Sequence, residues 1–329
     1  MNGPKVHDYI REVVAGIKDP DKLILIGETP NVTPSTAPLF IAPERKELNL
    51  VIQFEHVNVD AGERNKWDIV PWKLTTFKGI LSKWQKEIAG KGWNGLYIGN
   101  HDQARCVSRF GNDGKYRVEA AKMLATMLLS LQGTPFIFQG DEIGMTNVAF
   151  ESIHDYRDVQ IINLFNDLKN KGVPEEKIME KIYYRGRDNA RTPMQWDSSE
   201  KAGFTTGEPW IKINDNKAFI NVEESLADEN SVFNYYRKLI SIRKSNPIFM
   251  DGIYKEYLED SEKVFCFTRT NDTKEILVLL SFSKEDEIVE IPEEFHIEGA
   301  KILISNYSAQ AERLITLPPY GAVVFIRDK

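Results

Sequence analysis

The sequence predicts an α/β protein with an antiparallel β-sandwich in its carboxyl-terminal part. Up to about Gly252, short apolar runs of strand length alternate with longer segments whose apolar residues recur with the helical period. Beyond that point the helical pattern stops, and short runs rich in β-branched and aromatic residues follow one another closely. Alternation of the first kind is typical of a parallel sheet covered by helices.

Four apolar runs are typical of strands in such a sheet, and each one ends in polar residues. Because the carboxyl ends of parallel strands meet at one edge of a sheet, we expect these polar side chains to line one site. The first run, Lys22–Ile26, has the composition of a strand buried on both faces. The predicted strands are 22–26, 48–54, 93–98 and 134–138.

The spacing of apolar residues predicts the helices between and after these runs. At 73–91, Phe77, Trp84 and Ile88 fall on one face of a helix. The segment 116–131 is apolar almost all round, so we expect a mostly buried helix there. The other predicted helices are 5–17, 155–170, 174–184 and 229–244.

The remainder of the chain divides into a long irregular segment and the sandwich. Residues 185–209 include Arg187 and Arg191, and a loop of this length is either functional or a surface insertion; the sequence leaves both interpretations open. We expect an α/β domain over residues 1–248 and a sandwich domain over 249–329. The predicted sandwich strands are 264–270, 276–282, 288–291, 301–305, 314–317 and 322–326.

Composition and charge narrow the functions that the chain can have. Its 329 residues carry a net charge of −7, and the pI is about 5.5. An acidic protein of this kind is a poor binder of nucleic acid or of an anionic membrane, so we expect neither as a partner. No apolar run has the length of a membrane span, and the first residues lack the order of a signal peptide. We therefore expect a cytoplasmic protein.

Carboxylates and imidazoles gather at the four strand ends. Glu28, Glu55, Asp102 and Asp141 each follow one strand, and a histidine stands beside two of them. The two cysteines are far apart and lack metal-ligand spacing, so we expect no metal and no other cofactor. Such a pocket suits proton transfer, and glycoside hydrolysis is the reaction that most plainly needs paired carboxylates. Asn100 and Asp102 could instead cap the following helix, and a structural role is favoured for Asp141.

Seven motifs resemble those of the α-amylase superfamily of glycoside hydrolases, most closely its oligo-1,6-glucosidase and α-glucosidase branch. The resemblance extends over essentially the whole chain and implies about strands five to eight of a (β/α)8 barrel, followed by the sandwich. It also implies retaining catalysis through a covalent glucosyl-enzyme. The motifs are IGETP at 26–30, QFEHVNVD at 53–60, NHDQAR at 100–105, RFGNDG at 109–114, GTPFIFQGDEIGMTN at 133–147, RDNARTPMQW at 187–196 and GFTTGEPW at 203–210.

The resemblance assigns roles to individual residues. Glu28 matches the family's general acid/base, and Asp102 matches the carboxylate that binds sugar hydroxyls and stabilises the transition state. The chain departs from the family at Ala104, where a proline is usual, and this loosens the loop. The substrate-binding residues that the resemblance implies are Glu55, His101, Gln103, Arg105 and Arg191.

The family's nucleophile has no counterpart in the sequence. It is an Asp two residues after an Arg on the fourth barrel strand, and no Arg-x-Asp occurs here. Since the first strand matches the fifth of the barrel, we expect strands one to four, the nucleophile and any calcium loop to precede Met1. The chain would then be a fragment that is inactive alone. Its open sheet edge would invite an amino-terminal half-barrel chain or self-association.

The expected function is that of an exo-acting α-glucosidase on short oligosaccharides. A non-catalytic remnant that binds sugar or only associates is the second hypothesis. Trehalose-6-phosphate hydrolase and sucrose isomerase or glucosyltransferase activities are further alternatives, although the isomerases carry an Arg-rich loop where this chain has residues 58–65. These residues do not determine the preference between α-1,6 and α-1,4 linkages or the oligomeric state.

Overall fold

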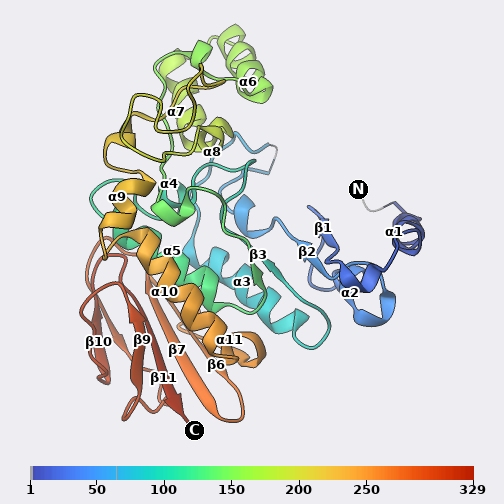
Figure 1. The fold of residues 1–329 in the computed structure, drawn as a ribbon, viewed down its shortest axis with the longest axis vertical. Helices are drawn as coiled ribbons and strands as arrows, with labels where there is room; N and C mark the ends of the chain where they lie inside the picture. Colours follow the sequence, from blue (N-terminus) through green and yellow to red (C-terminus); the bar gives the residue numbers. More distant parts are fainter. Residues whose placement is uncertain (1–2, 64) are drawn as a thin grey trace.

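The computed structural model describes residues 3–63 and 65–329 (Figure 1). Helices α1 to α11 are Val6–Ala15, Pro38–Ile41, Leu74–Ile88, Cys106–Phe110, Arg117–Ser130, Val159–Asn170, Glu175–Arg185, Asp188–Arg191, Val222–Ala227, Val232–Ser245 and Ile248–Asp251. Strands β1 to β11 are Ile26–Glu28, Leu50–Ile52, Gly95–Leu96, Thr134–Pro135, Ile253–Tyr257, Val264–Thr270, Lys274–Ser281, Glu287–Glu290, Lys301–Ser305, Leu314–Leu317 and Ala322–Asp328. Among the described residues, no helix combines the length and the apolar character that crossing a membrane requires.

The first four strands pair in parallel, in the order in which they occur along the chain. β1 pairs with β2, β3 pairs with β4, and a bridge between Val51 and Asn94 joins the two pairs. Parallel pairing was predicted from the sequence and is confirmed. The strands are shorter than the predicted apolar runs, because only two or three residues of each run pair with a neighbouring strand.

The prediction that Lys22–Ile26 is buried on both faces is wrong. Leu23 is 47%, Ile24 73% and Ile26 46% exposed. β1 has β2 on one side, and no strand of the described residues lies along its other edge. The apolar composition of this run therefore fits a central strand, whereas in this structure it forms an edge.

Helix α5 lies at the centre of the largest apolar cluster. All its residues from Ala120 to Ser130 are buried, which confirms the prediction of a mostly buried helix. Helix α6 starts at Val159, later than predicted, because the Asp158 side chain accepts a hydrogen bond from the Gln160 amide and caps the helix. Helices α6 and α7 bury a separate cluster that includes Ile161, Phe165, Ile178 and Ile182.

The carboxyl-terminal strands form two antiparallel sheets. The larger has the order β5-β6-β7-β11-β9, and the smaller pairs β10 with β8. Alternate residues of β6 face opposite layers: Val264 and Cys266 pack toward the small sheet, and Phe265 and Phe267 pack toward the helices. The large sheet is thus covered on both faces. Strand β5 was not predicted from the sequence, because it follows directly on the short helix α11.

Candidate active site

The polar cluster after β3 forms a tight turn. The Oδ1 atom of Asn100 accepts a hydrogen bond from the Asp102 amide at 2.8 Å, and the Asn100 carbonyl accepts one from the Gln103 amide at 3.3 Å. Helix α4 begins only at Cys106, and no side chain caps it. Asn100 therefore holds the turn, and the helix-cap interpretation of this cluster is wrong.

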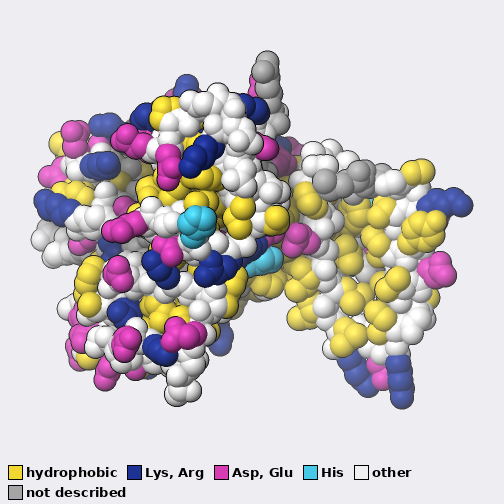
Figure 2. All heavy atoms as spheres, turned by 90° about the horizontal axis from the view of Figure 1, so that it is seen from above, with side chains coloured by type: hydrophobic (Ala, Val, Ile, Leu, Met, Phe, Trp, Pro, Cys, Tyr) yellow, Lys and Arg dark blue, Asp and Glu magenta, His cyan; other side chains and the backbone are white. Residues whose placement is uncertain are grey.

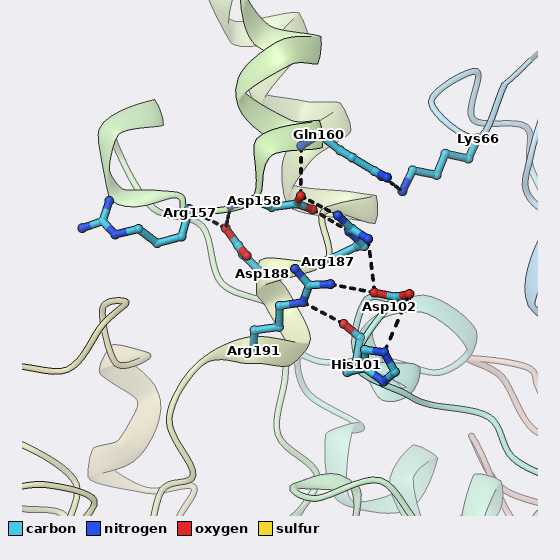
Figure 3. Close-up of polar contacts among 9 residues, drawn as sticks. All are labelled: Lys66, His101, Asp102, Arg157, Asp158, Gln160, Arg187, Asp188 and Arg191. Atoms are coloured by element: carbon cyan, nitrogen blue, oxygen red, sulfur yellow. Dashed lines mark hydrogen bonds and ion pairs between the residues drawn. The ribbon is translucent and has the colours of Figure 1, made fainter.

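Two arginines bind the Asp102 carboxylate (Figure 3). Its Oδ1 atom accepts hydrogen bonds from Nη2 of Arg191 at 2.6 Å and from Nη1 of Arg187 at 3.3 Å. Nε of Arg191 also donates to the His101 carbonyl at 2.9 Å, so this arginine binds both the backbone and the side chain of the turn. Charge-assisted hydrogen bonds of this geometry fix the orientation of the carboxylate.

Arg187 is held in turn by Asp158 at the start of α6. Its Nε and Nη2 atoms donate to the two carboxylate oxygens of Asp158, both at 2.7 Å. Burial alone would raise the pKa of Asp158, but the hydrogen bonds and charge of Arg187 hold that pKa below its usual value. The chain of contacts from Asp102 through Arg187 to Asp158 links the end of β3 to α6.

The site is open to solvent on one side. The side chain of His101 is 66% exposed and that of Asp102 is 39% exposed, and His101 Nε2 lies 3.8 Å from Oδ2 of Asp102. One ligand can therefore contact both side chains.

A cavity of about 200 Å³ adjoins Asp102, between the end of β3, the loop after β2 and helices α6 and α7. Nζ of Lys66 donates to Oε1 of Gln160 at 2.6 Å at its rim (Figure 3). Positively and negatively charged side chains therefore both line this cavity. Its lining residues are Phe54, Asn58, Lys66, Asp102, Gln103, Gln160, Arg185 and Arg187.

A network of buried charged side chains holds the turn after β3 in place. Nη1 of Arg109 donates to Oε1 of Gln103 at 2.6 Å, and Nε of Arg109 donates to Asp60 at 2.6 Å. Arg185 and the Tyr184 hydroxyl also donate to Asp60, which is fully buried. Burial would raise the pKa of Asp60, but the hydrogen bonds and charges of the two arginines lower it. Gln103, predicted to bind substrate, is thus held through Arg109 while it still lines the cavity.

Glu28 lies at the carboxyl end of β1, exposed to solvent. Among the described residues, no hydrogen bond or ion pair restrains its carboxylate. Its charge acts on Tyr97, whose pKa is raised first by burial and then by Glu28. Tyr97 follows β3, is buried, and donates its hydroxyl hydrogen to the Gln53 carbonyl at 2.8 Å. Glu28 therefore belongs to the same sheet edge as the turn at Asp102.

The structure turns Glu55 and His56 away from this edge. The Glu55 carboxylate accepts hydrogen bonds from Lys83 Nζ at 2.8 Å and from Trp84 Nε1 at 3.2 Å, both on α3. His56 is buried; its Nε2 donates to the Tyr97 carbonyl at 2.7 Å, and burial lowers its pKa to about 4. This geometry favours an anchoring role for Glu55 over the substrate contact predicted from the sequence.

The Arg105 side chain likewise makes its hydrogen bonds inside the protein, to backbone carbonyls. Its side chain is 2% exposed. It donates to the carbonyls of Gln139 at 2.6 Å, Asn189 at 3.2 Å and Ala190 at 3.3 Å. The predicted direct contact with substrate does not fit this burial, and the arrangement favours a residue that positions the end of β4 against α8.

The carboxylates after β4 are structural in this arrangement. Oε2 of Glu142 accepts a hydrogen bond from the Gly140 amide at 2.7 Å. Asp141 is buried beside Cys106, and this burial raises its pKa to about 6. No group of three or more His, Cys, Asp or Glu side chains suited to a metal ion occurs within residues 3–63 and 65–329.

Sequence reasoning missed several groups that build the site. Arg187 precedes Arg191 by four residues, so helical spacing could have placed both on one face of a turn. Asp158 and Lys66 give no local signal, because each reaches the site from a segment far away in sequence. Asp60 ends the motif at 53–60, but sequence reasoning gave it no role.

The comparisons with known proteins agree with this fold. The family model described as "Alpha amylase, catalytic domain" matches residues 1–252. The chain therefore belongs to the alpha-amylase family of glycoside hydrolases, whose fold is a TIM barrel with a carboxyl-terminal β-sandwich.

Individual relatives show which members of the family the chain resembles. An oligo-1,6-glucosidase from Parageobacillus thermoglucosidasius is 50% identical over 329 residues, which are 99% of this chain and 58% of that protein. The solved trehalose-6-phosphate hydrolase of Bacillus licheniformis is 40% identical with a TM-score of 0.96, over 100% of this chain and 60% of that one. A trehalulose synthase structure is 36% identical with a TM-score of 0.93, over 99% of this chain and 60% of that one. The chain thus spans about three fifths of the length of these relatives.

Proposed function

We propose that this chain supplies the general acid/base and the transition-state-stabilising carboxylate of a retaining, exo-acting α-glucosidase of the oligo-1,6-glucosidase type. Its four parallel strands would be strands five to eight of the barrel. The observation that carries the proposal is the Asp102 carboxylate, fixed by Arg187 and Arg191 at a strand end yet open to solvent beside His101. Neutral oligosaccharides with α-glucosidic bonds are the proposed substrates.

In this mechanism Glu28 protonates the oxygen of the leaving sugar and later activates water. Asp102 and His101 bind hydroxyls of the reacting glucose, and these bonds strengthen as the ring flattens toward the oxocarbenium-like transition state. The nucleophile has to come from a segment other than these 329 residues, which hold no Arg-x-Asp. Glu28 is exposed here, so the water-excluded surroundings that a general acid needs at neutral pH would come from that same segment.

The test joins this chain to the amino-terminal part of the Parageobacillus relative that it does not match. We expect the fused protein to release p-nitrophenol from p-nitrophenyl α-glucoside, whereas the chain alone releases none. Glu28→Gln should lower kcat about 10²- to 10⁴-fold in the fused protein, because general acid–base catalysis contributes about that much. Glu142→Gln is the control after another strand of the same sheet, β4, and should retain activity. A well-folded fused protein without turnover would contradict the proposal.

The cavity beside Asp102 favours one second candidate, a phosphorylated disaccharide as substrate. Lys66, Arg185 and Arg187 line this cavity and could bind a phosphate group. The fused protein separates the candidates: a trehalose-6-phosphate hydrolase would cleave the phosphorylated sugar far faster than isomaltose. Formation of isomaltulose from sucrose would indicate isomerase activity instead, and glucose binding without any turnover would support the non-catalytic reading.

A further inference from the structure

A second polar cavity lies where helices α5 and α10 meet the large carboxyl-terminal sheet. Its volume is about 280 Å³, and its walls come from α5, the start of α10 and the end of β9. Helix α10 packs along α5, and β9 is an edge strand of the large sheet (Figure 1). This cavity shares no lining residue with the one beside Asp102.

Lys122 of α5 brings a buried ammonium group to this cavity. The residue is 9% exposed, and its Nζ atom donates a hydrogen bond to the Asn230 carbonyl and lies 5.6 Å from the centre of the Tyr235 ring. Within residues 3–63 and 65–329, no carboxylate forms an ion pair with it. Burial lowers the pKa of Lys122, and the charges of Glu119 and Asp228 only oppose this shift. Because buried charges are normally paired, the remaining N–H groups of this lysine suit an anion.

Lys238 supplies a second positive charge at the same cavity. It lies on α10 and is exposed to solvent. In the described part of the chain, no hydrogen bond or ion pair holds its ammonium group. Its charge lowers the pKa of Lys122, so the two ammonium groups repel each other. An anion between them would remove this repulsion.

Uncharged donors lie beside the two lysines. Tyr307 follows β9 and lines the cavity, and its buried hydroxyl has no hydrogen-bond partner among the described residues. Burial raises the pKa of Tyr307 to about 12, so the hydroxyl keeps its hydrogen at neutral pH and can donate it. Asn306 holds this wall in place, since its Nδ2 atom donates to the Glu119 carbonyl of α5 at 3.0 Å.

The start of α10 adds to the positive potential. Ser231 is the N-cap of this helix and lines the cavity, and the first N–H groups of a helix carry partial positive charge. Glu229 contributes a carboxylate to the lining, but it is exposed to solvent, where its charge is screened. The donors therefore outweigh the acceptors in this cavity.

The rest of the molecule does not attract anions. The chain carries a net charge of −7. On the face drawn in Figure 2, Lys and Arg side chains are interspersed with Asp and Glu, without a broad cationic surface. Binding of an anion would thus depend on the groups in the cavity and not on a general attraction.

We propose that this cavity is a binding site for a phosphate group, held by Lys122, Lys238 and the Tyr307 hydroxyl. Ammonium groups, hydroxyls and helix amino termini are the donors with which proteins bind phosphate. The cavity is larger than a phosphate ion requires, so the phosphate monoester of a sugar fits as well as inorganic phosphate does. The site is independent of the proposed glucosidase function, and no step of that mechanism uses it.

Isothermal titration calorimetry of the chain with inorganic phosphate and with glucose 6-phosphate tests the proposal. We expect a saturable site whose Kd rises at least about tenfold in Lys122→Met, which loses a buried charged donor. Tyr307→Phe keeps the shape of the side chain and should raise the Kd about two- to tenfold, the effect of one neutral hydrogen bond. Lys238→Ala removes an exposed charge and should raise the Kd about two- to fivefold.

Two control variants separate this site from other cations. Lys244→Ala removes an exposed lysine at the end of the same helix and should leave the Kd unchanged. Lys66→Ala alters the cavity beside Asp102, which also contains cations, and should leave this binding unchanged as well. A lower Kd for glucose 6-phosphate would identify a sugar phosphate as the ligand, and equal values would identify the phosphate group alone.

Three results would overturn the proposal. The first is the absence of phosphate binding, and the second is a Kd that neither Tyr307→Phe nor Lys238→Ala changes. The third is an equal loss of affinity in Lys244→Ala or a complete loss in Lys66→Ala, which would assign the binding to general charge or to the Asp102 cavity. Circular dichroism shows that each variant is folded, and release of p-nitrophenol by the fused protein tests the glucosidase function separately.

Discussion

At the residue scale, the site depends on charges that come from separate segments. Asp102 follows β3, Arg187 and Arg191 flank one turn of α8, and Asp158 caps α6. Arg187 lies between the carboxylates of Asp102 and Asp158, and Arg191 binds the Asp102 carboxylate and the His101 carbonyl, so each guanidinium has a defined position before a ligand arrives. Preorganisation of this kind lowers the cost of binding a transition state.

Replacing Arg191 tests the clamp on Asp102. In the fused protein, Arg191→Lys should lower kcat/KM about 10- to 100-fold, because lysine cannot bind the His101 carbonyl and the Asp102 carboxylate at once. Steady-state kinetics with p-nitrophenyl α-glucoside measures the change. Arg327→Lys, at an ion pair with Glu275 in the large sheet, serves as the control and should leave kcat/KM unaffected.

Asp141 gives stability an unusual pH dependence. Burial raises its pKa from 3.8 to about 6, so the folded state binds more protons than the unfolded state between these values. The ionised carboxylate then destabilises the fold above pH 6 and has no effect below pH 3.8. Asp141→Asn should therefore stabilise the protein by up to about 3 kcal/mol at pH 8 and by little at pH 4, at 1.36 kcal/mol per pKa unit.

Urea unfolding of the variant and the unchanged protein at both pH values measures this difference. The variant has to be compared with the unchanged protein at each pH, because His56 changes the stability with pH in the opposite direction. Its pKa is lowered from 6.5 to about 4, so its contribution is present above pH 6.5 and is lost as the pH falls toward 4. An equal effect of Asp141→Asn at both pH values would show that the carboxylate is not destabilised by burial.

At the element scale, single buried cations join one helix to the carboxyl-terminal sheet and another helix to the end of α5. Nζ of Lys78 on α3 donates to the carbonyls of Leu258 at 2.6 Å, Ser261 at 2.8 Å and Val264 at 3.0 Å. Arg243 on α10 donates in the same way to the carbonyls of Leu129 and Leu131, at the end of α5. These contacts satisfy carbonyls that helix ends and loops would otherwise leave unpaired.

Lys78 is accordingly expected to matter more than other lysines of its helix. Lys78→Met should cost about 2–4 kcal/mol of unfolding free energy, because three carbonyls lose their donor at a fully buried position. Lys86→Met, which removes an exposed ion pair with Glu259, should change stability by less than about 1 kcal/mol. Urea denaturation gives both values, and equal losses would contradict the role given to Lys78.

At the scale of the whole molecule, one apolar cluster joins the parallel strands, their helices and the large sheet. Leu96 of β3, Leu124 of α5 and Phe267 of β6 belong to it. The predicted boundary at residue 248 remains a prediction about how the chain is organised, and this core crosses it. Two independent folding units are therefore not expected.

Cooperative unfolding follows from this shared core. Phe267→Ala should cost about 3–5 kcal/mol and should speed amide exchange in α5 as much as in β7. Phe165→Ala in the separate cluster under α6 and α7 should speed exchange mainly within that lobe. Hydrogen exchange followed residue by residue distinguishes the two patterns, and unchanged exchange in α5 of the Phe267 variant would refute the shared core.

The sequence by itself determined the order of elements, the parallel pairing, the family and the carboxylates at the strand ends. These features follow from local periodicity and from motifs, and a chain carries such signals wherever it folds. Only the tertiary structure decided which of the predicted residues face the site. Arg105 and Glu55 turn inward because carbonyls and α3 side chains satisfy them there. Asp158, through Arg187, and Lys66, across the cavity, come to the site around Asp102 from distant segments. Contacts of this second kind depend on how loops pack together, and no pattern within one segment records them.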